Sequence, residues 1–195
     1  MPRSELLPPF AVSDGSHGGE WFSNQGGAIF DSEPESMSQS SFHSKDLRKG
    51  RCSLVGQAYA ITKCVAGRQP LLLRPTKQGS VAAEVIIEAL RIRHEQGIWA
   101  CYAYVVMPDH VHFVIRQLQG NLAPSMASFS KFTGLLLNEL LDHKGSFWQQ
   151  GYYDHGLRGE KSLEAYLSYI WLNPVRAGLV QKPEEWRFQS IHPKW

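Results

Sequence analysis

The sequence contains no run of about 18 apolar residues, which is the length that a membrane-spanning helix needs. Its first residues lack the basic stretch followed by an apolar core that marks a secretory signal. The three cysteines, at positions 52, 64 and 101, are widely spaced and form no Cys-x-x-Cys pair, so we expect reduced thiols. These absences predict a cytoplasmic protein with no membrane partner.

Charged residues are also few, and they are unevenly distributed. Only 19% of the 195 residues are charged, and the formal net charge is +2. Residues 1–50 contain four Lys or Arg against seven Asp or Glu, a balance of −3, which leaves sixteen against eleven, or +5, for residues 51–195. A modestly basic domain permits a nucleic-acid partner without requiring one.

The first 50 residues lack hydrophobic periodicity. Stretches such as SDGSHGGEWFSNQGG are rich in Gly and Ser and carry acidic side chains. Such a segment cannot bury enough apolar surface to offset the entropy lost on ordering. We therefore predict a disordered segment at 1–50 and one folded domain at 51–195. One hypothesis is that the segment is upstream sequence read through an early start codon.

The rest of the chain alternates between strand patterns and helix patterns. The predicted strands are 57–65, 98–106, 110–117 and one or two short strands within 145–158. The predicted helices are 79–96, 121 to about 143, and 163–172. In the last helix, Ser162 is the expected N-cap, and Asn173-Pro174 is expected to end or kink the helix. This order predicts an α+β fold in which helices pack on an antiparallel sheet, with the C-terminal tail packed back on the domain.

The stretch YVVMPDHVHFVI, residues 104–115, has the composition of a buried strand but contains two histidines. Side chains two positions apart on a strand share a face, so His110 and His112 should point away from the core side chains Val111 and Phe113. A divalent cation would hold both imidazoles neutral, because it binds the unprotonated nitrogen. Histidines satisfied by backbone or carboxylate partners are the alternative that this pattern leaves open.

Two other histidine-based sites are excluded by the sequence. A histidine-triad hydrolase needs a third histidine two residues further on, where this chain has Val114. A metallo-β-lactamase-type site needs His-x-His-x-Asp-His, which is absent.

A second group of candidate residues lies in YLSYIWLNPVRAGLV, residues 166–180. Tyr169 and Asn173 are four residues apart and would lie on neighbouring turns of one helix face. Tyr169 falls on the flank of the apolar face, from which it could reach a site at the sheet surface. The alternatives are an ordinary half-buried tyrosine and an asparagine that caps the helix C-terminus.

Together, VVMPDHVHFVI and YIWLNPVRAGLV resemble the REP-associated tyrosine transposases, which are single-tyrosine transposases of the His-hydrophobic-His superfamily related to the insertion sequence 200-like group. The resemblance extends over about residues 48–192, where RKGRCSLVGQAYAIT is similar to the family's opening strand and FWQQGYYDH to the segment before its last helix. It implies a ferredoxin- or RRM-like fold of the His-hydrophobic-His endonuclease type, with the histidines on an antiparallel sheet, and the possibility of a homodimer.

The resemblance also implies roles for individual residues. His110 and His112 would be metal ligands, with Asn173 as the third metal contact where relatives often carry Gln. Tyr169 would be the nucleophile, and His155 matches a family histidine near the site whose role is open. The implied cofactor is Mg²⁺ or Mn²⁺. The implied partner is single-stranded DNA with a hairpin from a repetitive extragenic palindrome, which the enzyme would cut and rejoin through a 5′-phosphotyrosine intermediate.

Basic and aromatic residues outside these motifs are candidates for contacting the DNA, because basic groups track phosphates and aromatic rings stack on unpaired bases. The candidates are Arg68, Arg74, Lys77, Lys131, Trp148, Tyr152, Tyr153, Arg158 and Arg176. For each one, an ordinary surface charge or core aromatic is the alternative.

Two other functions are consistent with a fold of this class. One is a domesticated protein that binds DNA hairpins without cutting them, which the intact His110, His112 and Tyr169 disfavour. The other is an RNA-binding module of similar α+β build, which does not explain the paired histidines.

Overall fold

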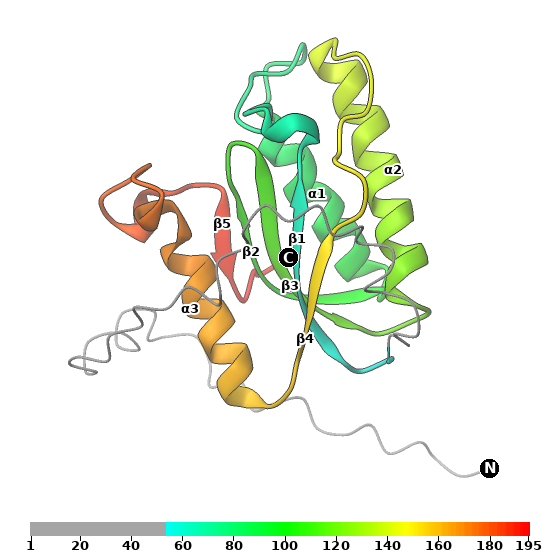
Figure 1. Cartoon of the computed structure of the whole chain (residues 1–195), viewed down its shortest axis with the longest axis vertical. Coiled ribbons are helices and arrows are strands. Elements are labelled where there is room, and N and C mark those ends of the chain that lie inside the picture. The colour runs from blue at the N-terminus through cyan, green and yellow to red at the C-terminus, as the bar shows by residue number, and fades with distance from the viewer. Residues whose placement is uncertain (1–53) are drawn as a thin grey trace. The chain divides into compact units, whose positions relative to one another are not determined.

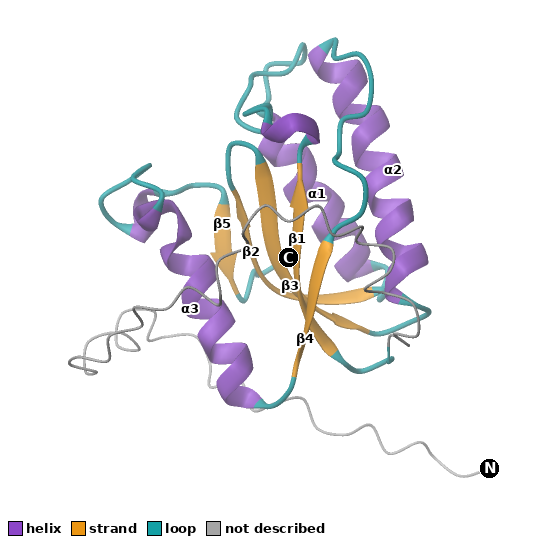
Figure 2. Ribbon diagram, viewed as in Figure 1, coloured by secondary structure: helices purple, strands orange, loops and turns teal. Residues whose placement is uncertain are grey.

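The computed structural model describes residues 54–195, so the prediction of disorder for 1–50 lies outside the described residues. This part of the chain forms one five-stranded antiparallel sheet with helices on both faces, which confirms the predicted α+β fold (Figures 1 and 2). The strand order across the sheet is β4-β1-β3-β2-β5.

The elements follow one another closely along the chain. The strands are β1 (Ala58–Cys64), β2 (Trp99–Val106), β3 (His110–Gln117), β4 (Tyr153–Leu157) and β5 (Gln189–Ile191). The α-helices are α1 (Ala82–Glu95), α2 (Leu122–Leu141) and α3 (Glu160–Arg176), and the short 3₁₀ helices are η2 (Ala66–Arg68) and η3 (Pro183–Glu185). No helix in residues 54–195 is long and apolar enough to cross a membrane.

The larger core lies between the sheet and helices α1 and α2. Val111 and Phe113 of β3 are fully buried there, and Phe113 and Phe129 of α2 pack with ring centroids 5.7 Å apart. Trp99 at the start of β2 completes this aromatic cluster, 6.0 Å from Phe113. Burying large side chains of this kind contributes about 1.5–3 kcal/mol each, and this face holds most of the buried apolar side chains of the described residues.

The opposite face of the sheet is covered by α3. Ile170 of this helix is buried against Val105 and Val114, in a smaller apolar cluster. The middle of the histidine face of β3 is apolar, because Val114 shares this face and is fully buried. His110 and His112, at the start of β3, lie outside this apolar cluster and are only partly buried.

Helix α3 differs from its predicted bounds at both ends. Its N-cap is Gly159, whose φ of 82° favours glycine, so Ser162 lies inside the first turn and is not the cap. The helix does not end at Asn173-Pro174 but continues to Arg176. A proline can be accommodated in a helix when the preceding turns are held by packing, and Pro174 and Ile170 are both buried.

The C-terminal tail packs back on the domain, as predicted. Strand β5 adds to the edge of the sheet by pairing antiparallel with β2. The Trp186 indole N–H donates a hydrogen bond of 3.1 Å to the Val106 carbonyl, and Trp195 stacks on Tyr104 with ring centroids 5.8 Å apart.

Candidate functional site

The β2–β3 hairpin presents both histidines at the start of β3, directly after the Met107-Pro108-Asp109 turn. Strand β1 pairs with β3 on its other side, in a register that places Cys64 opposite His110 and Thr62 opposite His112. Residues paired across an antiparallel ladder point to the same face, so all four side chains share the α3 side of the sheet. The predicted common face of the two histidines is confirmed.

The two imidazoles converge through their Nε2 atoms. His110 Nε2 and His112 Nε2 lie 3.0 Å apart, and the rings meet edge to face with centroids 4.6 Å apart. Two nitrogens that bind one ion at right angles, each about 2.1 Å from it, would be separated by about 3.0 Å. The spacing of the pair therefore fits shared coordination of one cation.

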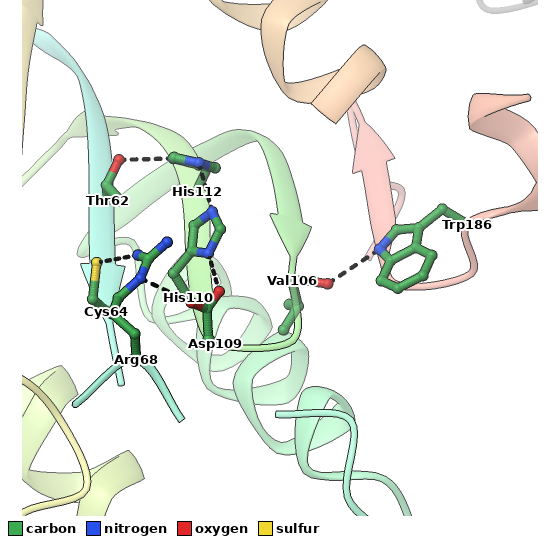
Figure 3. Close-up of polar contacts among 8 residues, drawn as sticks. All are labelled: Thr62, Cys64, Arg68, Val106, Asp109, His110, His112 and Trp186. Carbon is green, nitrogen blue, oxygen red and sulfur yellow. Dashed lines mark hydrogen bonds and ion pairs between the residues drawn. The ribbon is translucent and has the colours of Figure 1, made fainter. Parts of the chain in front are cut away.

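The other nitrogen of each ring is held by a polar neighbour (Figure 3). His110 Nδ1 lies 2.6 Å from Asp109 Oδ1, and His112 Nδ1 lies 2.7 Å from the Thr62 hydroxyl. When each Nδ1 carries the proton and donates it outward, both Nε2 lone pairs face the same gap. This is the arrangement that a pair of metal-binding histidines requires.

Burial favours the neutral form of both rings. It lowers the pKa of His112 to about 3, and the charges of His110 and Arg68 act in the same direction. It also lowers the pKa of His110, because loss of hydration outweighs the attraction of Asp109 for the protonated ring. Both imidazoles are therefore neutral near pH 7 and able to act as ligands.

Tyr169 reaches this pair from α3, within the same subunit. Its ring lies edge to face with His112, with centroids 5.5 Å apart. The Arg176 guanidinium lies over the same ring, with Cζ 5.2 Å from the centroid. Tyr169 is partly buried and packs against the smaller apolar cluster, so its position on the flank of the helix brings it to the sheet surface.

Asn173 is the least defined member of the predicted site. It is 9% exposed and lies one turn after Tyr169, inside α3, so it does not cap the helix, whose C-cap is Ala177. Across residues 54–195, no three His, Cys, Asp or Glu side chains gather closely enough to hold a metal ion. A third protein ligand would therefore have to be of another type, and the Asn173 amide stays a prediction.

His155 lies on β4, on the same side of the sheet as the histidine pair, because it is registered with Ala60 of β1. It is exposed and stacks on Tyr166 with ring centroids 5.6 Å apart. Tyr166 in turn contacts Tyr169 at 6.3 Å, so His155 is linked to the predicted nucleophile through one ring. Burial and the charge of Tyr169 raise the pKa of Tyr166.

Three of the DNA-binding candidates lie beside the site. Arg68 contacts Asp109, Arg176 covers Tyr169, and Tyr153 is 47% exposed at the position of β4 that pairs with Thr62. Their placement is compatible with contacts to a nucleic acid that occupies the site.

The other candidates lie elsewhere or are buried. Trp148 is 6% exposed, and its indole N–H donates to Thr133 at 2.9 Å, so base stacking by this residue is wrong and its place is in the core. Lys77 forms an exposed ion pair with Asp142, and Tyr152 is partly buried against the larger core. The remaining three are exposed: Arg74, Lys131 and Arg158.

Sequence reasoning missed three neighbours of the site. Thr62 comes from another strand, and only the β1–β3 register brings it to His112. Tyr166 lies three residues before Tyr169 on one helix face, and this spacing was the available signal. Asp109 directly precedes His110, and this adjacency was the available signal.

Comparison with known proteins gives consistent results. The profile of the family described as "Transposase IS200 like" matches residues 61–173. A REP-associated tyrosine transposase from Escherichia coli strain K12 is 26% identical over 144 residues, which cover 73% of this chain and 81% of that protein. A relative from Haemophilus influenzae, whose name places it provisionally in the same group, is 29% identical over 101 residues, covering 46% of this chain and 57% of its own length.

A solved structure is similar as well. A REP-associated tyrosine transposase bound to a REP hairpin superposes with a TM-score of 0.55 at 23% identity, over 73% of this chain and 81% of that one. At this identity the likeness shows that the fold is shared.

Proposed function

Because the chain belongs to the IS200-like transposase family, we propose that it cuts and rejoins single-stranded DNA at REP-type hairpins, with Tyr169 as the nucleophile. One observation carries the proposal. The Tyr169 ring lies 5.5 Å from the ring of His112, whose Nε2 is 3.0 Å from that of His110, so a phenol from α3 meets two imidazoles from β3 in one subunit.

The choice of substrate is supported by the relatives. The Escherichia coli protein is named as a REP-associated tyrosine transposase, and a protein of that kind was solved bound to a REP hairpin. The exposed Tyr153 and the cationic Arg68 and Arg176 beside the site supply the groups that an unpaired strand requires, namely a stacking surface and positive charge.

In the proposed reaction, the Tyr169 hydroxyl loses its proton and its oxygen attacks a backbone phosphorus atom. A bond forms between the tyrosine oxygen and the phosphorus, which stays on the 5′ end of the downstream fragment. The P–O3′ bond breaks, and the leaving 3′ oxygen of the upstream fragment takes up a proton. The phosphotyrosine link retains the energy of the broken phosphodiester. The 3′-hydroxyl of another strand can therefore displace the tyrosine and rejoin the DNA without ATP.

Tyr169 is better placed for this role than its neighbour Tyr166. Tyr166 stacks on His155 rather than on the histidine pair, and its pKa is raised by burial. A phenol whose deprotonation is disfavoured is a poorer nucleophile at neutral pH. Tyr169 is the one of the two that contacts His112.

We also propose that His110 and His112, together with Asn173, hold Mg²⁺ or Mn²⁺. When bound, such an ion neutralises negative charge on the phosphate and orients it for in-line attack. The contribution of the protein is to present two neutral imidazoles from a central strand at a fixed spacing, with Asp109 and Thr62 holding the outer nitrogens. An amide and two imidazoles leave coordination positions for water and phosphate oxygen.

The test is covalent trapping. Labelled hairpin oligonucleotides, drawn from the palindromes that flank the gene, are incubated with wild-type protein and Tyr169→Phe, in Mg²⁺ or Mn²⁺ and in chelator. We expect a protein–DNA adduct that survives denaturing electrophoresis only for wild-type protein with metal. Tyr166→Phe serves as the matched control and should retain adduct formation.

Two outcomes would contradict parts of the proposal. An adduct formed by Tyr169→Phe would show that another residue is the nucleophile. Specific hairpin binding without any adduct from the wild-type protein would favour the non-catalytic hairpin-binding function instead.

A further inference from the structure

An ion pair connects the histidine site to a surface arginine. Arg68 Nε lies 2.8 Å from Asp109 Oδ2, while the other oxygen of that carboxylate, Oδ1, is 2.6 Å from His110 Nδ1 (Figure 3). A second guanidinium nitrogen of Arg68 donates to Cys64 Sγ at 2.9 Å. Asp109 therefore bridges Arg68 and His110 with both of its oxygens.

The backbone of Arg68 is in a conformation that disfavours a side chain. Its φ is 55°, in the left-handed region, and it follows Gly67, whose φ is 62°. Left-handed conformations are uncommon for residues other than Gly, Asn and Asp, and such residues gather at functional sites. The turn itself is closed by main-chain bonding, with the Arg68 N–H donating to the Val65 carbonyl at 3.0 Å. Glycine would form this turn with less strain. The turn therefore does not require arginine, and we attribute the arginine at this position to the contacts of its side chain.

We infer that Arg68 and Asp109 form a relay that fixes the tautomer and direction of His110, so that its Nε2 points toward His112. The inference rests on the proposed metal site and assigns both residues a positioning role in it.

The geometry explains why two residues are needed. Asp109 lies in the turn before β3 and its side chain is 22% exposed, so its carboxylate would otherwise be free to rotate toward water. The Arg68 guanidinium pairs with Asp109 Oδ2 through Nε and donates to Cys64 Sγ through a second nitrogen. Because the guanidinium is held at both nitrogens, it fixes the carboxylate with Oδ1 directed at His110 Nδ1. A carboxylate at Nδ1 retains the proton there and leaves the Nε2 lone pair unprotonated.

Two simpler roles for Arg68 make different predictions. An exposed ion pair that serves only stability would affect unfolding and leave the imidazole unchanged. An arginine that only binds DNA phosphate would affect hairpin affinity and its salt dependence, and would also leave the metal-free imidazole unchanged.

The experiment compares wild-type protein with Asp109→Asn, Arg68→Gly and the control Arg187→Ala, which breaks another exposed ion pair, with Glu84. Ring ¹⁵N shifts of His110 in metal-free protein report which nitrogen carries the proton. Calorimetric titration with Mn²⁺ alone reports affinity, and thermal melting reports stability.

We expect Asp109→Asn to lose the fixed Nδ1–H tautomer and to bind Mn²⁺ about 10- to 100-fold more weakly, as is typical for outer partners of metal-binding histidines. Arg68→Gly should weaken Mn²⁺ binding roughly 3- to 5-fold, because the lost pair is partly exposed. Its melting temperature should nevertheless fall by no more than about 3 °C, since glycine relieves the left-handed backbone. Arg187→Ala should bind Mn²⁺ as wild type does.

The inference is overturned if His110 keeps its Nδ1–H signature in both variants, or if both bind Mn²⁺ as tightly as wild type. A wild-type protein that binds no Mn²⁺ would refute the proposed metal site separately. In that case the ¹⁵N shifts of the metal-free proteins alone decide whether the relay operates.

Discussion

The buried imidazole of His112 should make the fold sensitive to mild acid. Its pKa is about 3 in the folded protein, because burial opposes the charged form, whereas an unfolded histidine has a pKa near 6.5. Between these two values the unfolded chain binds a proton that the folded chain does not. Stability is therefore fully present above about pH 6.5 and decreases as the pH falls toward 3.

The size of the effect follows from the separation of the two pKa values. A pH of 5 lies about 1.5 units below the pKa of an unfolded histidine. This difference corresponds to a loss of about 2 kcal/mol in the free energy of unfolding, relative to neutral pH. His110 adds a loss of the same sign, because its pKa is lowered as well. For a domain with a typical stability of about 5–15 kcal/mol, this is a measurable fraction.

The assay is urea unfolding at pH 7.5 and pH 5.0 in the presence of a chelator, so that metal binding does not contribute. The decisive quantity is the difference between the two pH values, compared between wild type and His112→Asn, which cannot titrate. The control is His192→Asn, at an exposed histidine with a φ of 49° that asparagine tolerates. The free energy of unfolding decreases between pH 7.5 and pH 5.0. We expect this decrease to be about 2 kcal/mol smaller in His112→Asn and close to the wild-type value in His192→Asn. An equal acid loss in wild type and His112→Asn would refute the reasoning.

Three further predictions concern a buried lysine of β1, a tryptophan of the larger core and an exposed tyrosine of β4. Lys63→Met should destabilise the fold by about 1–3 kcal/mol, because the buried ammonium donates to two carbonyls of the loop before β4. Urea unfolding measures this loss, and unchanged stability would contradict the prediction. Trp148→Phe should cost about 1 kcal/mol through the lost hydrogen bond to Thr133 while hairpin affinity stays unchanged, as measured by fluorescence anisotropy. Tyr153→Ala should weaken single-strand binding by about 1–3 kcal/mol in the same assay with little change in stability, and wild-type affinity would remove this residue from the interface.

The elements of the sheet could be predicted because their patterns are strong and local. The β2–β3 hairpin follows from alternating apolar residues on either side of a proline turn, and its period of two places His110 and His112 on one face. Strand β5 has only three residues, too few for such a pattern, and it forms because β2 offers an open edge.

The partners of the site residues were beyond the reach of local patterns. Thr62 contacts His112 across fifty residues of sequence, and Arg68 reaches Asp109 across forty-one, so both contacts depend on how β1 registers with β3. The end of α3 was mispredicted for a related reason. Proline usually stops a helix, but Pro174 is buried within α3, and tertiary packing overrides that local preference.

Because β3 lies in the centre of the sheet, its register controls the larger core and the position of the histidine pair together. Sliding that strand by one residue against β1 would turn both imidazoles in among the aromatic rings beneath α1 and α2, and would expel Val111 and Phe113 from the larger core. A chain with this shifted register would lose the packing of the larger core together with the histidine pair on the α3 face. Stably folded molecules are therefore those in which the two histidines already face α3.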